Sequence, residues 1–128
     1  MPTFPNMEKR YYMDDRWIKY GARLASKVYG KYRIASVVLD KRGKLLSTGT
    51  NSYTRSHPTQ ARHAAKSGNP SKQFLHAEIA ALINCRGVAY KIVTVRIKRD
   101  GTFGLAKPCP VCELAIKEAG IRIVEYTT

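Results

Sequence analysis

Helical and strand-like segments alternate along the second half of the chain, and this alternation constrains the fold more than any other feature of the sequence. Four segments follow one another there: a helical HAEIAALINCRG (76–87), a strand-like KIVTVRIKRDG (91–101), a helical PCPVCELAIKEAG (108–120) and a strand-like IRIVEY (121–126). Pro108, Gly87 and Gly120 stand where helices commonly begin or end. Strands that alternate with helices predict one sheet with helices packed on its faces.

The first half of the sequence begins with another predicted helix. Apolar residues recur every three or four positions from Trp17 to Val28, and Asp14 or Asp15 can cap the start of this helix. Gly30 marks its predicted end. The pattern indicates an amphipathic helix of about four turns, whose apolar side faces the sheet.

A hairpin and a long polar excursion follow. RIASVVLD (33–40), a turn at Gly43 and KLLSTGTN (44–51) have the composition of two paired strands. Residues 51–75 are polar and basic, with a short helix predicted over 58–68. Long excursions in compact domains are often functional, so we expect a binding loop here.

The length of 128 residues suits one hydrophobic core and one domain. Residues 1–12, which include Pro2 and Pro5, are predicted to form a flexible basic arm. Residues 13–128 are predicted to form the single domain.

The chain is strongly basic, with 23 Lys and Arg against 9 Asp and Glu and a formal net charge of +14. Such a surface attracts phosphorylated ligands and polyanions, so nucleotides and nucleic acids are the expected partners. The basic residues are spread from Lys9 to Arg122, and a merely solvated surface is the alternative. No apolar leader and no membrane-length apolar window is visible, which predicts an intracellular, cytoplasmic protein without a membrane partner.

Three cysteines, Cys85, Cys109 and Cys112, indicate metal or redox chemistry rather than a disulfide framework. His76, Cys109 and Cys112 form a compact candidate set for Zn²⁺, because a catalytic zinc uses three such ligands and leaves one position for water. Both cysteines stand at a predicted helix start, where the partial positive charge favours thiolates. His76 also lies near a helix start, so two helix N-termini could hold one ion between them.

Glu78 is an ionisable residue in the otherwise apolar, helix-prone run LHAEIAAL (75–82). Two positions after a ligand, its carboxylate can lie near the ion without binding it. There it could take a proton from zinc-activated water and pass it to a leaving group. A purely structural zinc would not require this carboxylate, so the sequence predicts a hydrolytic centre.

The sequence HAE at 76–78, followed by PCPVC at 108–112, resembles the signature of the zinc-dependent cytidine and deoxycytidylate deaminase superfamily. The resemblance extends over roughly residues 14–126. It implies a three-layer α/β/α sandwich with a central mixed sheet of four to five strands, truncated after the fourth main strand. It also implies His76, Cys109 and Cys112 as zinc ligands and Glu78 as the proton shuttle.

Further roles follow from the same resemblance. The backbone amides of Ala77 and Cys109 would lie near the attacked ring carbon, and Asn51 resembles the sugar-contacting asparagine of the family. Water would add at C4 of cytosine while Glu78 protonates N3 and then the departing ammonia. The implied net reaction converts cytosine to uracil.

This chain departs from the family pattern in three places. Lys107 precedes Pro108 where many relatives carry a small or acidic residue, so it is a candidate contact to substrate. The segment RDGTFGLAK (99–107) extends the preceding strand and is predicted to pair back on it. The chain also ends after its fourth main strand, which predicts an exposed sheet edge covered by a partner subunit in a homo-oligomer.

Several other residues each have two alternative predicted roles. His57 and His63 suggest a second metal site or a phosphate contact, although solvated or capping histidines are more common. Tyr126 could stack on a nucleobase or be a core or edge tyrosine. A phosphate-guiding rim, with a solvated loop as the alternative, comprises Arg55, Arg62, Lys66 and Lys72.

The leading function predicted from the sequence is zinc-dependent deamination of cytosine in a nucleoside or nucleotide, with a nucleotide like deoxycytidylate preferred. A rival with the same chemistry acts on cytosine in single-stranded DNA or RNA, which the net charge supports. Adenine is a third possible base, because the same centre can attack C6 of a purine. The non-enzymatic alternative is a basic nucleic-acid-binding module with a structural zinc.

Overall fold

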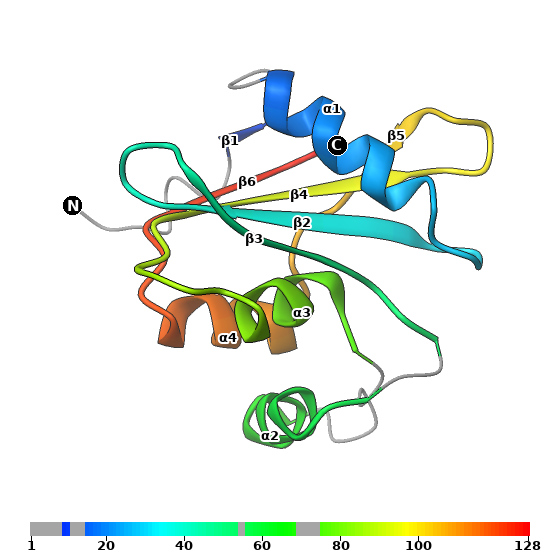
Figure 1. Ribbon diagram of the computed structural model, residues 1–128. Coiled ribbons are helices and arrows are strands. Elements are labelled where there is room, and N and C mark those ends of the chain that lie inside the picture. Colours follow the sequence, from blue (N-terminus) through cyan, green and yellow to red (C-terminus); the bar gives the residue numbers. More distant parts are fainter. Residues whose placement is uncertain (1–8, 11–14, 54–55, 69–74) are drawn as a thin grey trace.

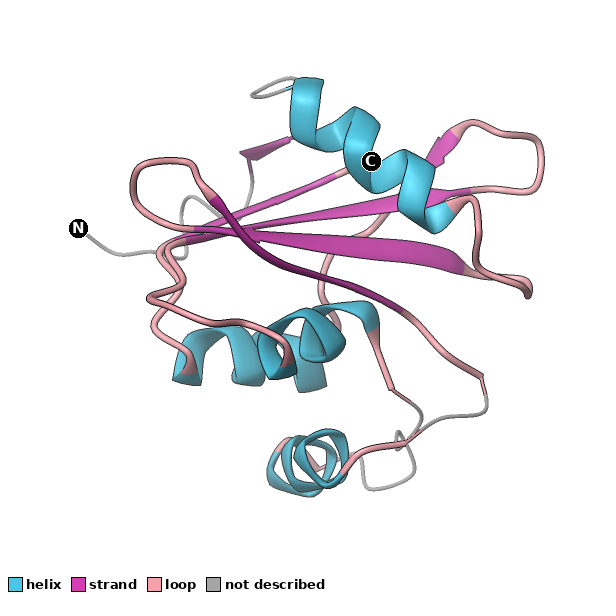
Figure 2. Ribbon diagram, viewed as in Figure 1, coloured by secondary structure: helices cyan, strands magenta, loops and turns pink. Residues whose placement is uncertain are grey.

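The protein is a mixed β-sheet with helices on both faces in the computed structural model, which describes residues 9–10, 15–53, 56–68 and 75–128 (Figure 1). The elements are β1 (Lys9–Arg10), α1 (Asp15–Ala25), β2 (Arg33–Leu39), β3 (Leu45–Thr50), α2 (Pro58–Lys66), α3 (Ala77–Ile83), β4 (Lys91–Ile97), β5 (Phe103–Gly104), α4 (Pro110–Glu118) and β6 (Ile123–Tyr126). Figure 2 shows α1 on one face of the sheet and α3 and α4 on the other, which confirms the predicted three layers. Among the described helices, none has the length and apolarity needed to cross a membrane.

The four longer strands lie in the order β6-β4-β2-β3. β2 is antiparallel to both β3 and β4, whereas β4 and β6 are parallel and are joined through α4. The predicted hairpin is therefore confirmed as β2 and β3. The expected return of the chain after the Asp100-Gly101 turn is confirmed as well, because Phe103–Gly104 pairs with the end of β4.

Helix α1 covers one face of the sheet through an apolar cluster that includes its Ile18 and Ala25 and the strand residue Val95. Gly21 permits a close approach, since a side-chain carbon there would lie 2.7 Å from Cγ2 of Val95. The helix ends at Ala25, about a turn before the predicted end near Gly30.

Helix α3 packs directly against β3 on the opposite face. A side-chain carbon at Gly49 would overlap the backbone nitrogen of Ala81 and would lie 2.7 Å from the carbonyl oxygen of Ala77. The hydroxyl of Ser47 donates a hydrogen bond of 2.7 Å to the carbonyl oxygen of Ala81. These contacts fix α3 on the sheet, and the helix ends at Ile83, before the predicted end at Gly87.

The sheet edge at β6, predicted to be exposed and covered by a partner subunit, is paired with the chain's own N-terminal segment. Lys9 pairs with Glu125 and Arg10 with Tyr126 in a short parallel ladder. Part of the predicted flexible arm therefore belongs to the sheet. The remaining residues of that arm lie outside the described residues.

Thr127 joins β4 to β5 and to the segment after β5. Its buried hydroxyl accepts a hydrogen bond from the Arg96 backbone N–H at 3.1 Å and donates one to the Gly104 carbonyl at 2.7 Å. The Thr127 carbonyl accepts a hydrogen bond of 2.9 Å from the Ala106 N–H. The chain entering α4 is thereby held beside the sheet.

Candidate active site

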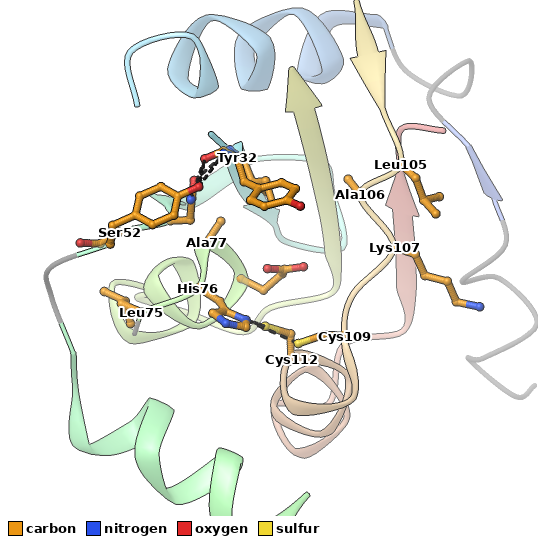
Figure 3. Close-up of a pocket in the computed structure, with 14 residues that line it drawn as sticks. Tyr32, Ser52, Leu75, His76, Ala77, Leu105, Ala106, Lys107, Cys109 and Cys112 are labelled. Atoms are coloured by element: carbon orange, nitrogen blue, oxygen red, sulfur yellow. Dashed lines mark hydrogen bonds between the residues drawn. The ribbon is translucent and has the colours of Figure 1, made fainter. Parts of the chain in front are cut away.

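The N-termini of α3 and α4 meet, and each ends in a residue with a metal-binding side chain. His76 is the N-cap of α3 and Cys109 the N-cap of α4, both with extended backbone. Neither side chain caps its own helix. The Nδ1 atom of His76 instead lies 3.3 Å from Sγ of Cys112 and 3.5 Å from Sγ of Cys109 (Figure 3).

These three side chains fit a zinc ion. Their ligand atoms all lie within 4.8 Å of one another, and they form the one such cluster of three found among the described residues. One imidazole nitrogen and two thiolates are a known ligand set for catalytic zinc, which leaves a fourth position open. The structure thus brings together the residues that the sequence predicts as ligands.

The two cysteine thiols share a proton unequally. The hydrogen bond with Cys112 and the contact with His76 lower the pKa of Cys109 to about 3 despite its partial burial. The same hydrogen bond and full burial raise the pKa of Cys112 above its ordinary value. A metal ion bound by both sulfurs would take the place of their protons.

Glu78 lies in the first turn of α3 and is only 6% exposed. Burial raises the pKa of its carboxyl group above the ordinary value, and the negative charge of Cys109 adds to this effect. A hydrogen bond from the backbone of Glu78 itself, the charge of His76 and a hydrogen bond with Cys112 each lower the same pKa by a smaller amount than burial raises it. A carboxyl group with a raised pKa beside a metal-binding site is suited to both accepting and donating a proton.

Gln60, on α2, supports the backbone of the metal-binding histidine. Its side chain is fully buried, and its Oε1 atom accepts a hydrogen bond of 3.1 Å from the backbone N–H of His76. This residue has no role in the sequence-based prediction. Its position in a polar, basic excursion offers no pattern that distinguishes it from its neighbours.

A cavity of about 320 Å³ opens over the cluster. It is lined by the cluster itself and by Tyr32, Ile34, Asn51–Tyr53, Leu75, Ala77, Glu78 and Leu105–Lys107. Its size is at the lower end of the range for small-molecule sites. Tyr32 and Tyr53 belong to this wall, and the sequence-based prediction overlooked both.

Three of the predicted substrate contacts line this cavity. Ala77 is the first residue of α3, where backbone N–H groups have no partner within the helix. The Asn51 side chain joins two strands, accepting a hydrogen bond of 2.9 Å from the N–H of Ile34 and donating one of 2.9 Å to the carbonyl of Tyr32. Lys107 is at the rim, and Figure 3 shows its side chain directed away from His76 and the cysteines.

Tyr126, the fourth predicted contact, does not line this cavity. It is 3% exposed and belongs to the hydrophobic cluster of Ile92, Ile116 and Val124. Tyr126 lies on the same face of β6 as Val124, and Ile116 of α4 packs in the same cluster, so this side chain is removed from the surface. The alternative interpretation, a core tyrosine, describes its position.

The two histidines of the basic excursion have local partners. His57 is the N-cap of α2, and its Nδ1 accepts a hydrogen bond of 3.0 Å from the Thr59 N–H. His63 is buried and lies 3.0 Å from a carboxylate oxygen of Glu118, with Lys66 at 3.2 Å from the other. No second metal cluster occurs in the described ranges. Of the predicted rim, Arg62 is exposed on α2, whereas Arg55 and Lys72 lie outside the described residues.

Solved structures with a similar fold are deaminases. The dCMP deaminase of the cyanophage S-TIM5 in its apo form superposes with a TM-score of 0.61 at 19% sequence identity, covering 88% of this chain and 79% of that chain. A glutamate-to-glutamine mutant of cytidine deaminase from Mycobacterium tuberculosis gives a TM-score of 0.56 at 16% identity, covering 91% and 86%. At these identities the likeness establishes the fold alone. A comparison with curated protein sequences gave no significant match.

The family model described as "Cytidine and deoxycytidylate deaminase zinc-binding region" matches residues 11–128. This match includes both halves of the metal cluster, the buried Glu78 and every main strand of the sheet. The chain belongs to the cytidine and deoxycytidylate deaminase zinc-binding family.

Proposed function

We propose that this protein is a hydrolase that converts cytosine to uracil and releases ammonia. The observation that carries the proposal is the buried carboxyl group of Glu78 beside the His76, Cys109 and Cys112 cluster, inside one cavity. Membership of a deaminase family supports the same chemistry. The first candidate substrate is a cytosine nucleoside or nucleotide, with a nucleotide like deoxycytidylate preferred.

His76, Cys109 and Cys112 would hold the zinc ion, which when bound supplies Lewis-acid activation of a water molecule. Glu78 takes one proton from this water and delivers it to N3 of cytosine as the oxygen adds at C4. It then delivers the second proton to the exocyclic amine, so that the C4–N4 bond breaks and ammonia leaves. Water and cytosine are consumed, and uracil and ammonia are formed.

Other residues of the cavity hold the base in place. The backbone N–H groups of Ala77 and Cys109, at two helix N-termini, would lie near C4, the ring carbon that is attacked. Ile34 and Leu75 provide apolar contact for the ring and limit water around it. Asn51, already fixed by two hydrogen bonds to the backbone, would offer its remaining hydrogen-bonding capacity to the sugar.

A polynucleotide substrate is the second candidate, and the formal net charge of +14 favours it. Each Lys or Arg that contacts a phosphate releases counterions, so the affinity for a polymer would fall steeply with salt. A cytosine in a single strand can leave the stack at little cost and enter the same cavity. The predicted homo-oligomer stays a prediction, for which light scattering is the measurement.

The test is product detection by mass spectrometry with zinc-loaded wild type and Glu78→Ala. Deoxycytidine, deoxycytidylate, cytidylate, adenosine, and single-stranded DNA and RNA are offered in parallel. We expect uracil from at least one cytosine compound with wild type and none with Glu78→Ala, although zinc content and melting temperature stay close to those of wild type. Substantial turnover by Glu78→Ala would remove Glu78 from the mechanism, and a zinc-loaded wild type inert to every compound would reject the proposed function.

A further inference from the structure

A second hollow adjoins the cavity, on the other side of the segment Asn51–Tyr53. It has a volume of about 480 Å³ and is lined by Leu24, Lys27, Val28, Tyr29 and Thr50–Tyr53. Asn51, Ser52 and Tyr53 line both hollows. A single stretch of chain thus separates the proposed reaction site from a further binding surface.

This separating segment is held firmly in place. The ring of Tyr53 lies against Gly30, where a side-chain carbon would overlap the ring atoms. The Tyr53 hydroxyl accepts a hydrogen bond from the backbone N–H of Tyr32 and donates one of 3.1 Å to its carbonyl oxygen. Asn51 binds the backbone of Ile34 and Tyr32 in the same way. The two hollows therefore keep a fixed geometry relative to each other, as a preorganised site does.

Three tyrosines around the hollows have rings that are open to solvent. Tyr29 is 97% exposed, and Tyr32 and Tyr53 are 42% and 41% exposed. A tyrosine as exposed as Tyr29 contributes little to the core. Exposed aromatic rings beside cations are typical of surfaces that bind single-stranded nucleic acid, because every nucleobase can stack on them.

The charges at this end of the sheet are suited to phosphate. Lys27 lines the second hollow, and the Lys31 ammonium and the Arg96 guanidinium lie 5.5 and 4.8 Å from the centroid of the Tyr32 ring. Asp100, the acidic side chain of the neighbouring β4–β5 turn, accepts two hydrogen bonds from Thr102, which lower its pKa and keep it negatively charged. Lys27 and Tyr29 thus line the second hollow, and Lys31 and Arg96 lie beside the ring of Tyr32, which lines the first.

We propose that the second hollow binds the nucleotide adjacent to the reacting cytosine, which favours the second candidate substrate, a single-stranded nucleic acid, over a free nucleotide. The neighbouring base stacks on Tyr29 and Tyr53, and the phosphates on either side contact Lys27 and Lys31. A free nucleotide would fill the first cavity only and would leave these features without a ligand. This inference rests on the proposed cytosine deamination and names its substrate class.

The test measures binding of a short fluorescein-labelled oligonucleotide with one cytosine among thymines, or among uracils for the RNA form, by fluorescence anisotropy. All proteins carry Glu78→Ala, are loaded with zinc and thus leave the probe unchanged. Tyr29→Ala, Tyr29→Phe and Lys27→Ala are added in turn. Lys44→Ala is the matched control, since it removes the same charge from an exposed lysine at the other end of β3.

We expect Tyr29→Ala to weaken binding about five- to a hundredfold, because it removes one stacked base, and Tyr29→Phe to retain the affinity. Lys27→Ala should reduce the slope of log affinity against log salt by about 0.7, whereas Lys44→Ala leaves it unchanged. The more tightly bound of the two probes identifies DNA or RNA as the polymer. Equal affinities for Tyr29→Ala and its parent, or equal slope changes for the two lysine variants, would overturn the inference.

Product detection separates this inference from the proposed function. If wild type converts free deoxycytidylate and Tyr29→Ala does not change oligonucleotide binding, the second subsite is rejected and the deaminase function is supported. If oligonucleotide binding depends on Tyr29 but no cytosine compound yields uracil, the nucleic-acid-binding surface is supported and the proposed deamination is rejected. Uracil in the oligonucleotide, reduced by Tyr29→Ala, supports both.

Discussion

The side-chain oxygen of Gln60 accepts a hydrogen bond from the backbone N–H of His76, 3.1 Å away, and links two segments that are far apart in role. Gln60 belongs to α2 in the basic excursion, whereas His76 begins α3 and carries one of the three candidate zinc ligands. The excursion between β3 and α3 therefore has a structural task in addition to any contact with substrate. It satisfies a backbone donor at the point where the metal-binding imidazole must be held still.

Replacing Gln60 by methionine, which has a similar volume and no strong acceptor, leaves the N–H of His76 without this partner. We expect a loss of about 1–3 kcal/mol in the free energy of unfolding. We also expect zinc affinity to fall about 10- to 100-fold, as happens when a group that holds a metal ligand in position is removed. Competition with a zinc chelator measures the affinity. Arg62→Ala on the same helix is the control, and a Gln60→Met protein that matches it in both quantities would refute this support.

Cys109→Ser and Cys112→Ser should each abolish tight zinc binding and destabilise the fold, because metal binding and folding are coupled. Cys85→Ser is the matched control, since Cys85 is half-buried beyond the other end of α3. The measurements are the metal content by mass spectrometry and the melting temperature with and without chelator. The chelator should lower the melting temperature of wild type and Cys85→Ser and leave that of the other two variants unchanged. Full zinc content in Cys112→Ser would contradict the ligand assignment.

The metal cluster was predictable because its residues lie at helix starts with short, characteristic spacings. Two cysteines three positions apart, and a histidine and a glutamate two apart, carry that information within a few residues of chain. The alternation of helices and strands predicted the sheet for a similar reason, since each element has its own period. Family membership and the fold agree with both predictions.

What the sequence did not predict depends on contacts between distant segments. Tyr126 is in the core because it packs with Ile92 of β4 and Ile116 of α4, and the four residues of β6 show no alternation that would reveal this. The pairing of Lys9 and Arg10 with β6 is only two residues long and leaves no hydrophobic pattern. The hydrogen bond from the His76 N–H to Gln60 can be predicted only when the packing of α2 is known. Such contacts follow from the assembled fold and not from local propensity.

Gly49 is required for the approach of α3 to β3, and Gly49→Ala tests this. The new methyl group would overlap the backbone at Ala81, and the helix can avoid it only by moving away from the strand. We expect a loss of about 1–3 kcal/mol or more in the free energy of unfolding. His76 begins this helix, so zinc affinity should fall as well. Thr48→Ala is the control, because side chains alternate along a strand and Thr48 faces away from α3. A Gly49→Ala protein with unchanged stability and zinc affinity would show that the helix has room to adjust.

The cluster of His63, Lys66 and Glu118, which joins α2 to α4, should make stability depend on pH. Hydrogen bonds from Lys66 and then His63 hold the pKa of Glu118 below its ordinary value of 4.5. A carboxylate whose pKa is lower in the folded state stabilises the fold at pH values above its unfolded pKa, and this contribution disappears as the pH falls through the folded pKa. The contribution should therefore be complete at neutral pH and disappear below about pH 4.5, a window set by that pKa.

Urea unfolding of wild type and Glu118→Gln over a series of pH values measures this effect. Wild type should be the more stable protein at neutral pH, and the two curves should converge under acidic conditions. Lys66→Ala should reduce the difference because it removes the largest cause of the lowered pKa. Arg62→Ala, which removes an exposed cation from the same helix, should retain the pH dependence of wild type. A constant difference between wild type and Glu118→Gln from acidic to neutral pH would mean that the carboxylate's charge does not hold α2 against α4.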